Sequence, residues 1–94
     1  MNSINIIEYF ILIKGNVQGV FFRKYAQDKA KKLNITGWVK NLETSDVEMC
    51  IQGTQNQCEA MIKWCHKGSP YSHVSRVLPK KRTIKNHYKE YKII

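Results

Sequence analysis

Residues 15–23, which read Gly-Asn-Val-Gln-Gly-Val-Phe-Phe-Arg, constrain the fold of this chain more than any other stretch. An apolar run precedes them and a helical pattern follows, so they predict a strand, a loop bracketed by Gly15 and Gly19, and a helix. Two glycines let the backbone curl until successive N–H groups converge, and the helix N-terminus adds further unpaired donors. Such a loop suits an anion, and the guanidinium of Arg23 can bind two oxygens of a phosphoryl group at once.

The spacing of the glycines alone fits a tight strand-to-helix turn as well as it fits a phosphate site. Two common nucleotide-binding patterns are absent from the sequence. It contains no Gly-x4-Gly-Lys-Ser/Thr, and no Gly-x-Gly-x-x-Gly followed by an acidic residue about twenty positions later. Nucleotide binding is therefore disfavoured.

The first half of the chain predicts a strand, a helix and a hairpin. Residues 6–14 are mostly β-branched, aromatic or aliphatic, as in a strand of a sheet, and residues 22–33 have the period of an amphipathic helix that Asn34 ends in a left-handed conformation. Residues 35–40 and 47–52 predict two strands joined by a short polar turn. In the second of these, Val47, Met49 and Ile51 alternate with Glu48, Cys50 and Gln52.

The second half predicts one more helix and two more strands. Thr54 and Gln57 form a capping box, Gly68 ends the helix, and its core face holds Cys58, Met61, Ile62 and Cys65. A strand follows over residues 73–78, stopped by Pro79, and the last strand covers residues 88–94 with Tyr91 and Ile93 toward the core. The order β-α-β-β-α-β predicts an α+β ferredoxin-like sandwich, with two helices on one face of an antiparallel four- to five-stranded sheet.

Size and charge limit the class of protein. A chain of 94 residues without a linker or repeat fits one domain, residues 1–94, and its 16 basic against 7 acidic residues give a formal charge of +9. The charge attracts anions without naming one, and a solvated basic face is its simplest reading. The N-terminal apolar run is interrupted by Glu8 before it is long enough for a signal or a membrane span, so we expect a soluble, cytoplasmic protein.

The cysteines and histidines indicate neither a disulfide framework nor a metal site. Three cysteines, an odd number, do not make a complete disulfide framework, and we expect Cys50, Cys58 and Cys65 to be reduced thiols. The three histidines lack metal-ligand spacing, so we expect no metal site.

The loop of residues 15–23, together with Gly37-Trp38-Val39-Lys40-Asn41, strongly resembles the acylphosphatases. In combination, Val-Gln-Gly-Val-x-Phe-Arg and Gly-Trp-Val-Lys/Arg-Asn are specific to that family, and the resemblance covers nearly the whole chain. It implies metal-independent hydrolysis of the carboxyl-phosphate bond of small acyl phosphates, which releases a carboxylate and inorganic phosphate. It implies no cofactor, and we expect a monomer without a nucleic-acid or membrane partner.

The resemblance also implies the roles of individual residues. Arg23 and Asn41 are the expected catalytic residues, because Arg23 would bind the phosphoryl oxygens and Asn41 would position the attacking water. The backbone N–H groups of the loop would cradle the phosphoryl group. The loop residues are Gly15, Asn16, Val17, Gln18, Gly19 and Val20.

The chain departs from the family pattern at three places. Thr44-Ser45-Asp46 stands where the hairpin commonly has Asp-Gly, which leaves open the turn type and the aim of Asn41. Asn34 replaces a usual glycine, whose backbone region asparagine tolerates. Phe21 replaces a residue that is often smaller, and of its two possible roles, shaping the acyl pocket or packing, we expect packing.

Two other functions fit parts of the sequence. A basic β-α-β-β-α-β domain resembles RNA-binding modules, but the strand of residues 47–52 has no aromatic residue and no Lys/Arg-Gly-Phe-Gly-Phe-type motif occurs. A noncatalytic acylphosphatase-like domain, such as those fused to larger enzymes that handle carbamoyl phosphate, keeps the loop and the arginine too. We favour an active stand-alone enzyme, because the chain begins and ends as an isolated domain and has both Arg23 and Asn41.

Overall fold

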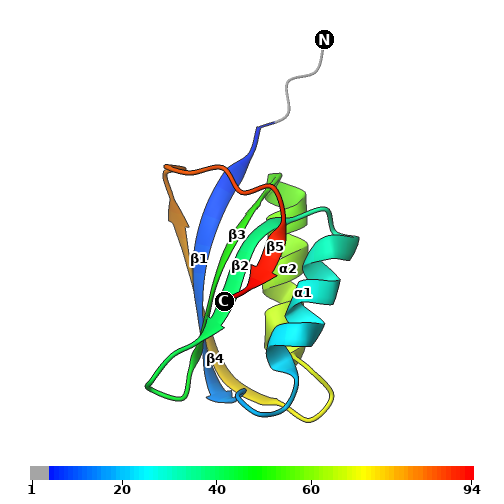
Figure 1. The fold of residues 1–94 in the computed structure, drawn as a ribbon, viewed down its shortest axis with the longest axis vertical. Coiled ribbons are helices and arrows are strands. Elements are labelled where there is room, and N and C mark those ends of the chain that lie inside the picture. The colour runs from blue at the N-terminus through cyan, green and yellow to red at the C-terminus, as the bar shows by residue number, and fades with distance from the viewer. Residues whose placement is uncertain (1–4) are drawn as a thin grey trace.

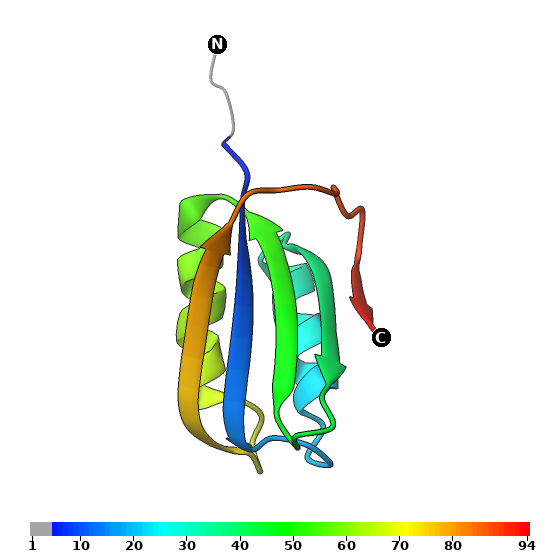
Figure 2. The same ribbon diagram turned by 90° about the vertical axis from the view of Figure 1, so that its left-hand side faces the viewer.

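The computed structural model describes residues 5–94, in which two helices pack on one face of a five-stranded sheet (Figure 1). Along the chain the elements are β1 (Ile7–Asn16), α1 (Phe22–Lys32), β2 (Thr36–Asn41), β3 (Val47–Gly53), α2 (Gln55–Lys67), β4 (His73–Arg82) and β5 (Tyr91–Ile93). The strands lie in the order β4-β1-β3-β2-β5, as Figure 2 shows for the first four. The predicted α+β ferredoxin-like sandwich is confirmed.

The fifth strand makes the sheet mixed. The first four strands pair antiparallel as predicted, but β5 runs parallel to β2, with Gly37 opposite Tyr91 and Val39 opposite Ile93. The last strand is also shorter than the predicted residues 88–94. Tyr91 points into the core as expected, whereas Ile93 is 37% exposed.

The predicted end of the fourth strand at Pro79 was wrong. β4 continues to Arg82, and Pro79 pairs with Ile11 of β1. Proline lacks the N–H that a central strand donates, but β4 is the edge of the sheet and has a neighbour on one side only. The edge position therefore allows β4 to continue past Pro79.

Local signals set the ends of both helices. Asn34 has a φ of 58°, the left-handed conformation predicted for it, and the N–H of Ile35 reaches back to the carbonyl oxygen of Ala30 at 2.8 Å. At α2, the Thr54 hydroxyl accepts from the N–H of Gln57, and the Gln57 side chain accepts from the N–H of Thr54. Gly68 ends this helix.

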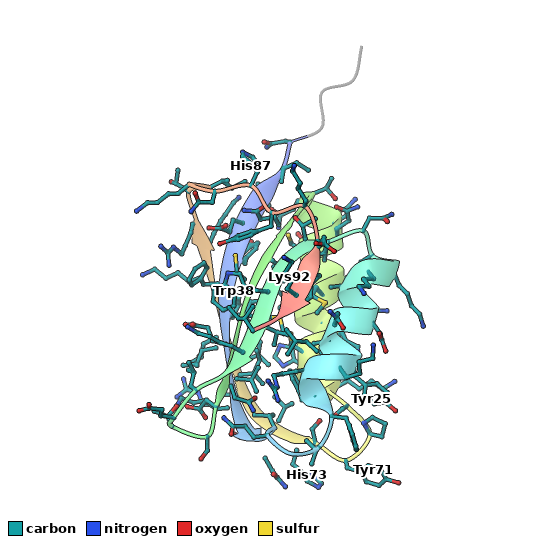
Figure 3. The ribbon with its side chains drawn as sticks, in the orientation of Figure 1. Tyr25, Trp38, Tyr71, His73, His87 and Lys92 are labelled. Carbon is teal, nitrogen blue, oxygen red and sulfur yellow. The ribbon has the colours of Figure 1, made fainter. Side chains whose placement is uncertain are left out.

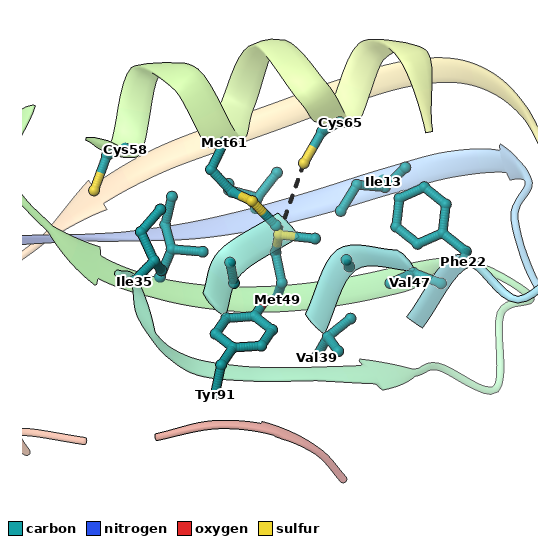
Figure 4. Packing of buried hydrophobic residues seen from close by; sticks show 14 of the residues in the cluster. Ile13, Phe22, Ile35, Val39, Val47, Met49, Cys58, Met61, Cys65 and Tyr91 are labelled. Atoms are coloured by element: carbon teal, nitrogen blue, oxygen red, sulfur yellow. Dashed lines mark hydrogen bonds between the residues drawn. The ribbon is translucent and has the colours of Figure 1, made fainter. Parts of the chain in front are cut away.

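The core lies between the helices and the sheet (Figure 4). Val47, Met49 and Ile51 of β3 are fully buried there, as their alternation predicts. The predicted core face of α2 buries Cys58, Met61 and Cys65, and the Cys65 thiol donates to the Met49 sulfur at 3.7 Å.

The opposite face of the sheet is partly covered by the segment of residues 83–90, which crosses from β4 to β5 (Figure 2). Gln52 bonds to this segment twice, because its amide donates to the carbonyl oxygen of Asn86 at 2.6 Å and accepts from the N–H of Tyr88 at 3.1 Å. The same amide group also donates to Glu8 at 2.8 Å, and the Cys50 thiol donates to Glu8 at 3.3 Å. Glu8, Cys50 and Gln52 are consequently buried.

Candidate functional site

The loop between β1 and α1 is anchored by its side chains. Val17 is buried in the core, and the hydroxyl of Ser69 donates to the carbonyl oxygen of Val20 at 2.8 Å. The amide of Gln18 donates to the carbonyl oxygens of Leu42 and Asp46, both at 2.8 Å. These contacts fix the loop from the inside and leave its backbone N–H groups available at the surface.

The N–H groups of this loop and of the first turn of α1 are unpaired. Within residues 5–94, no backbone or side-chain acceptor bonds to an N–H of residues 17–24. The helix has no side-chain cap at Phe21 and no acidic residue in its first turn. Unpaired N–H groups and an uncompensated helix dipole together favour a bound anion.

Gly19 supplies the backbone conformation that this loop needs. Its φ is 74°, in the left-handed region, and a Cβ added there would meet no atom within 4 Å. Glycine is therefore favoured at this position for its dihedral angles and not for lack of space.

A cavity of about 290 Å³ lies at the N-terminus of α1. It brings together four of the predicted site residues, Val17, Gly19, Arg23 and Asn41, from the loop, the helix and the end of β2. The other four predicted residues do not line it. Gly15 and Asn16 are the last residues of β1, Gln18 bonds to the hairpin, and Val20 packs against the core.

Arg23 and Asn41 both have unused bonding capacity. Arg23 is half-buried, and no acidic side chain within residues 5–94 forms an ion pair with it. The Oδ1 atom of Asn41 is buried, and no donor in the described part of the chain bonds to it. A buried polar atom without a partner costs about 1–3 kcal/mol, so both groups are suited to bind a ligand or its water.

The polar turn between β2 and β3 determines where Asn41 lies. Ser45 has a φ of 74°, its N–H donates to the carbonyl oxygen of Leu42 at 3.2 Å, and the N–H of Leu42 donates to the carbonyl oxygen of Asp46 at 2.9 Å. Lys14 and Thr44 both donate to the Asp46 carboxylate at 3.1 Å. Serine thus adopts the left-handed position for which glycine is common, and Gln18 connects this turn to the loop.

A family model described as Acylphosphatase matches residues 9–93. The chain belongs to the acylphosphatase family. An acylphosphatase of Geobacter metallireducens is 35% identical over 82 residues, which cover 87% of this chain and 88% of the relative. The solved acylphosphatase of Coxiella burnetii has a TM-score of 0.91 and 33% identity, and the match covers 96% of this chain and 94% of that one.

A structure of full-length HypF, in a phosphate- and nucleotide-bound form, also matches this acylphosphatase. Its TM-score is 0.87 at 28% identity. The match covers 99% of this chain but only 12% of HypF. The same domain therefore occurs both alone and as a small part of a larger protein.

Four residues that line the cavity were not among the site residues predicted from the sequence: Phe21, Phe22, Lys24 and Ile93. Lys24 follows Arg23 directly, and its exposed position on α1 resembles that of any solvated lysine. Ile93 was expected in the core but lines the cavity, because β5 ends beside Val39 of β2. Ile93 reaches the cavity through the pairing of two strands that are far apart in the sequence, so no local sequence pattern predicts its position.

Phe21 was expected to pack, but its side chain lines the cavity and is 73% exposed, so that prediction was wrong.

The cysteines lie in the interior and not at the site. All three are free and buried. Burial raises the pKa of the Cys58 thiol to about 11 and the pKa of the Cys65 thiol to about 12. Burial, and then the hydrogen bond to Glu8, also raise the pKa of Cys50 well above its ordinary value. The thiols are therefore protonated at neutral pH and poor nucleophiles.

Residues 5–94 contain no group of three or more His, Cys, Asp or Glu side chains arranged to hold a metal ion. None of their helices has the length and apolar character of a membrane span.

Proposed function

We propose that this acylphosphatase hydrolyses the carboxyl-phosphate bond of acyl phosphates in the cavity at the N-terminus of α1, without a metal ion. The observation that carries the proposal is the convergence of three unpaired groups: the loop N–H groups, the Arg23 guanidinium and the Asn41 Oδ1 atom. The N–H groups and Arg23 would bind the phosphoryl oxygens. Asn41 would position the water.

The chemistry requires few other groups. Water attacks phosphorus, the bond from phosphorus to the acyl oxygen breaks, and the electron pair leaves with the carboxylate. A carboxylate with a solution pKa near about 4 departs without a general acid. The enzyme must therefore hold the phosphoryl group, stabilise charge on its equatorial oxygens and place water in line.

The amide of Asn41 suits the water-positioning role. Its oxygen can accept a hydrogen bond from water, and its nitrogen can donate one. Because the amide is neutral, it does not repel the phosphoryl group. In this mechanism a phosphoryl oxygen of the substrate takes the proton that the attacking water loses.

A hydrolysis assay on two site variants tests these roles. The assay follows acetyl phosphate and benzoyl phosphate in the presence of EDTA, and isothermal calorimetry measures the binding of inorganic phosphate. Arg23→Ala removes a bidentate charged contact, so turnover should fall by more than about 10³-fold and phosphate binding should be lost. Asn41→Ala should lower turnover by about 10²-fold or more and leave phosphate binding intact.

Arg76→Ala provides the matched control, because Arg76 is an exposed arginine of β4 that does not line the cavity. This variant should hydrolyse both substrates like the wild type. Loss of phosphate binding in Asn41→Ala would contradict the division of roles. A wild-type protein without activity in EDTA would contradict metal-independent hydrolysis.

The match to HypF favours a second candidate, a binding domain without turnover. The matches to isolated acylphosphatases, which cover almost the whole of both chains, support the enzyme instead. Calorimetry with carbamoyl phosphate separates the two candidates. Binding without release of inorganic phosphate would identify a noncatalytic domain.

We further propose that residues 1–94 act as one monomeric domain in the cytoplasm, on a small substrate and without nucleic acid. The buried, unpaired thiols support a reducing compartment. Residues 1–4 lie outside the described part of the chain. On the face opposite the helices, Arg82 lies 3.9 Å from the centre of the Phe10 ring and Lys40 lies 5.2 Å from that of Trp38, so protein cations occupy aromatic faces that could otherwise stack bases.

A further inference from the structure

Two apolar side chains line the phosphate cavity without being buried in the core. Phe21 is 73% exposed and precedes α1, whereas Ile93 is 37% exposed and comes from β5. They are the two large apolar residues of the cavity wall that stay open to solvent. Exposed apolar surface beside a binding site indicates contact with an apolar part of the ligand.

The backbone at Phe21 is strained. Its φ is 60°, in the left-handed region, where glycine and asparagine are common and a bulky aromatic residue is unusual. The other non-glycine residues of positive φ in the described part of the chain, Asn34 and Ser45, are small and polar and lie in turns. Strain of this kind persists where the surrounding structure holds it and is frequent at functional sites. At Phe21 it keeps an aromatic ring beside the cavity instead of in the core.

The cavity wall offers little free charge for the acyl part of a substrate. Arg23 is needed for the phosphoryl group. The other cation of the wall, Lys24, is exposed and forms a surface ion pair with Asp28, with 3.2 Å between Nζ and Oδ1. The wall beyond the phosphate-binding groups is therefore mainly apolar.

We propose that Phe21 and Ile93 form the subsite for the acyl group, and that this enzyme prefers acyl phosphates with an aromatic or branched apolar acyl group. The inference rests on the proposed function, which places the phosphoryl group at the loop N–H groups and Arg23. From there the acyl group extends toward the open side of the cavity, where the two apolar side chains lie.

The test compares kcat/KM for benzoyl phosphate and acetyl phosphate. The wild type should favour benzoyl phosphate, and Phe21→Ala should lower this preference by about tenfold, as expected for the loss of an apolar contact in a specificity pocket. Ile93→Ala should lower it as well. Because both substrates are measured on the same protein sample, partial unfolding of a variant cancels from the ratio. Inhibition by inorganic phosphate, which lacks an acyl group, should not change.

Tyr71→Ala is the matched control. Tyr71 is 77% exposed and lies near the same end of the molecule as Tyr25 of α1 (Figure 3), but it does not line the cavity. The substrate preference of this variant should equal that of the wild type. An equal loss of preference in Tyr71→Ala and Phe21→Ala would contradict a specific subsite.

The outcomes separate this inference from the proposed function. If the wild type hydrolyses neither substrate, the proposed function fails and the inference fails with it. If it hydrolyses both and Phe21→Ala leaves the ratio unchanged, only the subsite is overturned. A preference for succinyl phosphate that Lys24→Ala removes would also overturn it, because the acyl group would then be recognised by charge.

Discussion

Gly19 and Gly37 both have positive φ values, 74° and 138°, but different surroundings. A Cβ at Gly19 would point into open space, whereas a Cβ at Gly37 would overlap the backbone oxygen of Cys50 on the neighbouring strand. Gly37 thus allows β2 and β3 to approach each other, and Gly19 shapes the anion loop.

This difference predicts different effects of the same substitution. Gly19→Ala should lower the free energy of unfolding by no more than about 1–2 kcal/mol, the most that a left-handed alanine costs, because the loop can relax to relieve that strain. The relaxation turns the loop N–H groups away from the phosphoryl group and should lower kcat/KM strongly. Gly37→Ala should cost about 3 kcal/mol or more, because backbone must move. Urea unfolding and a benzoyl phosphate assay measure both effects. Equal losses of stability would contradict the distinction.

At the level of elements, Gln18 joins the phosphate loop to the β2–β3 hairpin. Its amide donates to two carbonyl oxygens of the turn, and the strand that leads into this turn ends at Asn41. The loop N–H groups and the proposed water-positioning amide are therefore held in one relative orientation. Gln18 acts as a positioning residue, since it does not line the cavity itself.

Gln18→Met should separate positioning from binding. The substitution keeps the length of the side chain and removes both hydrogen bonds, so kcat should fall by about tenfold while inorganic phosphate still binds. Lys14→Met is the control, because it breaks a different side-chain contact to the same turn, the ion pair from Lys14 to Asp46. A similar fall of kcat in both variants would show that the loss comes from disturbing the turn in general and not from the two hydrogen bonds of Gln18.

Local patterns predicted the elements whose residues are close in sequence. The capping box at Thr54, the left-handed Asn34 and the core positions of β3 each depend on neighbours within a few residues, and all are confirmed. Pro79 was misread because a strand's place at the sheet edge depends on topology. The burial of Gln52 was missed for the same reason, since residues 83–90 return to cover it.

The residues of the candidate site also divide into those that sequence motifs predict and those that depend on contacts between distant segments. Arg23 and the loop glycine Gly19 belong to one motif, and Asn41 ends a second motif that the family resemblance connects to the first. Phe21 and Ile93 needed the structure, because the exposure of an aromatic ring and the end point of a three-residue strand depend on how distant segments pack.

For the molecule as a whole, buried thiol and phenol groups make the free energy of unfolding sensitive to alkaline pH. Burial raises the pKa of Cys58 and Cys65 to about 11 and about 12, and it raises the pKa of Tyr91 well above its ordinary value. The folded state therefore keeps protons that the unfolded chain releases above about pH 9 for a thiol and about pH 10 for a tyrosine. The stabilisation from these groups is complete below those values and is lost as the pH rises.

We accordingly expect the free energy of unfolding to fall between pH 9 and pH 11. Each fully buried thiol should contribute up to about 1.4 kcal/mol per pH unit in this range. Urea unfolding at several pH values, with a reductant present, measures the slope. The slope should be smaller in Cys65→Val, which has one acidic proton fewer, and an identical slope in this variant would refute the role of that thiol.

The order of the strands also leaves β4 as an open edge over ten residues. Its last part carries Pro79, which has no N–H to offer to a strand of another molecule, and then Lys80, Lys81 and Arg82, which repel a second copy. The basic residues of this strand therefore disfavour fibril-like association, in which β4 would pair with a strand of another molecule.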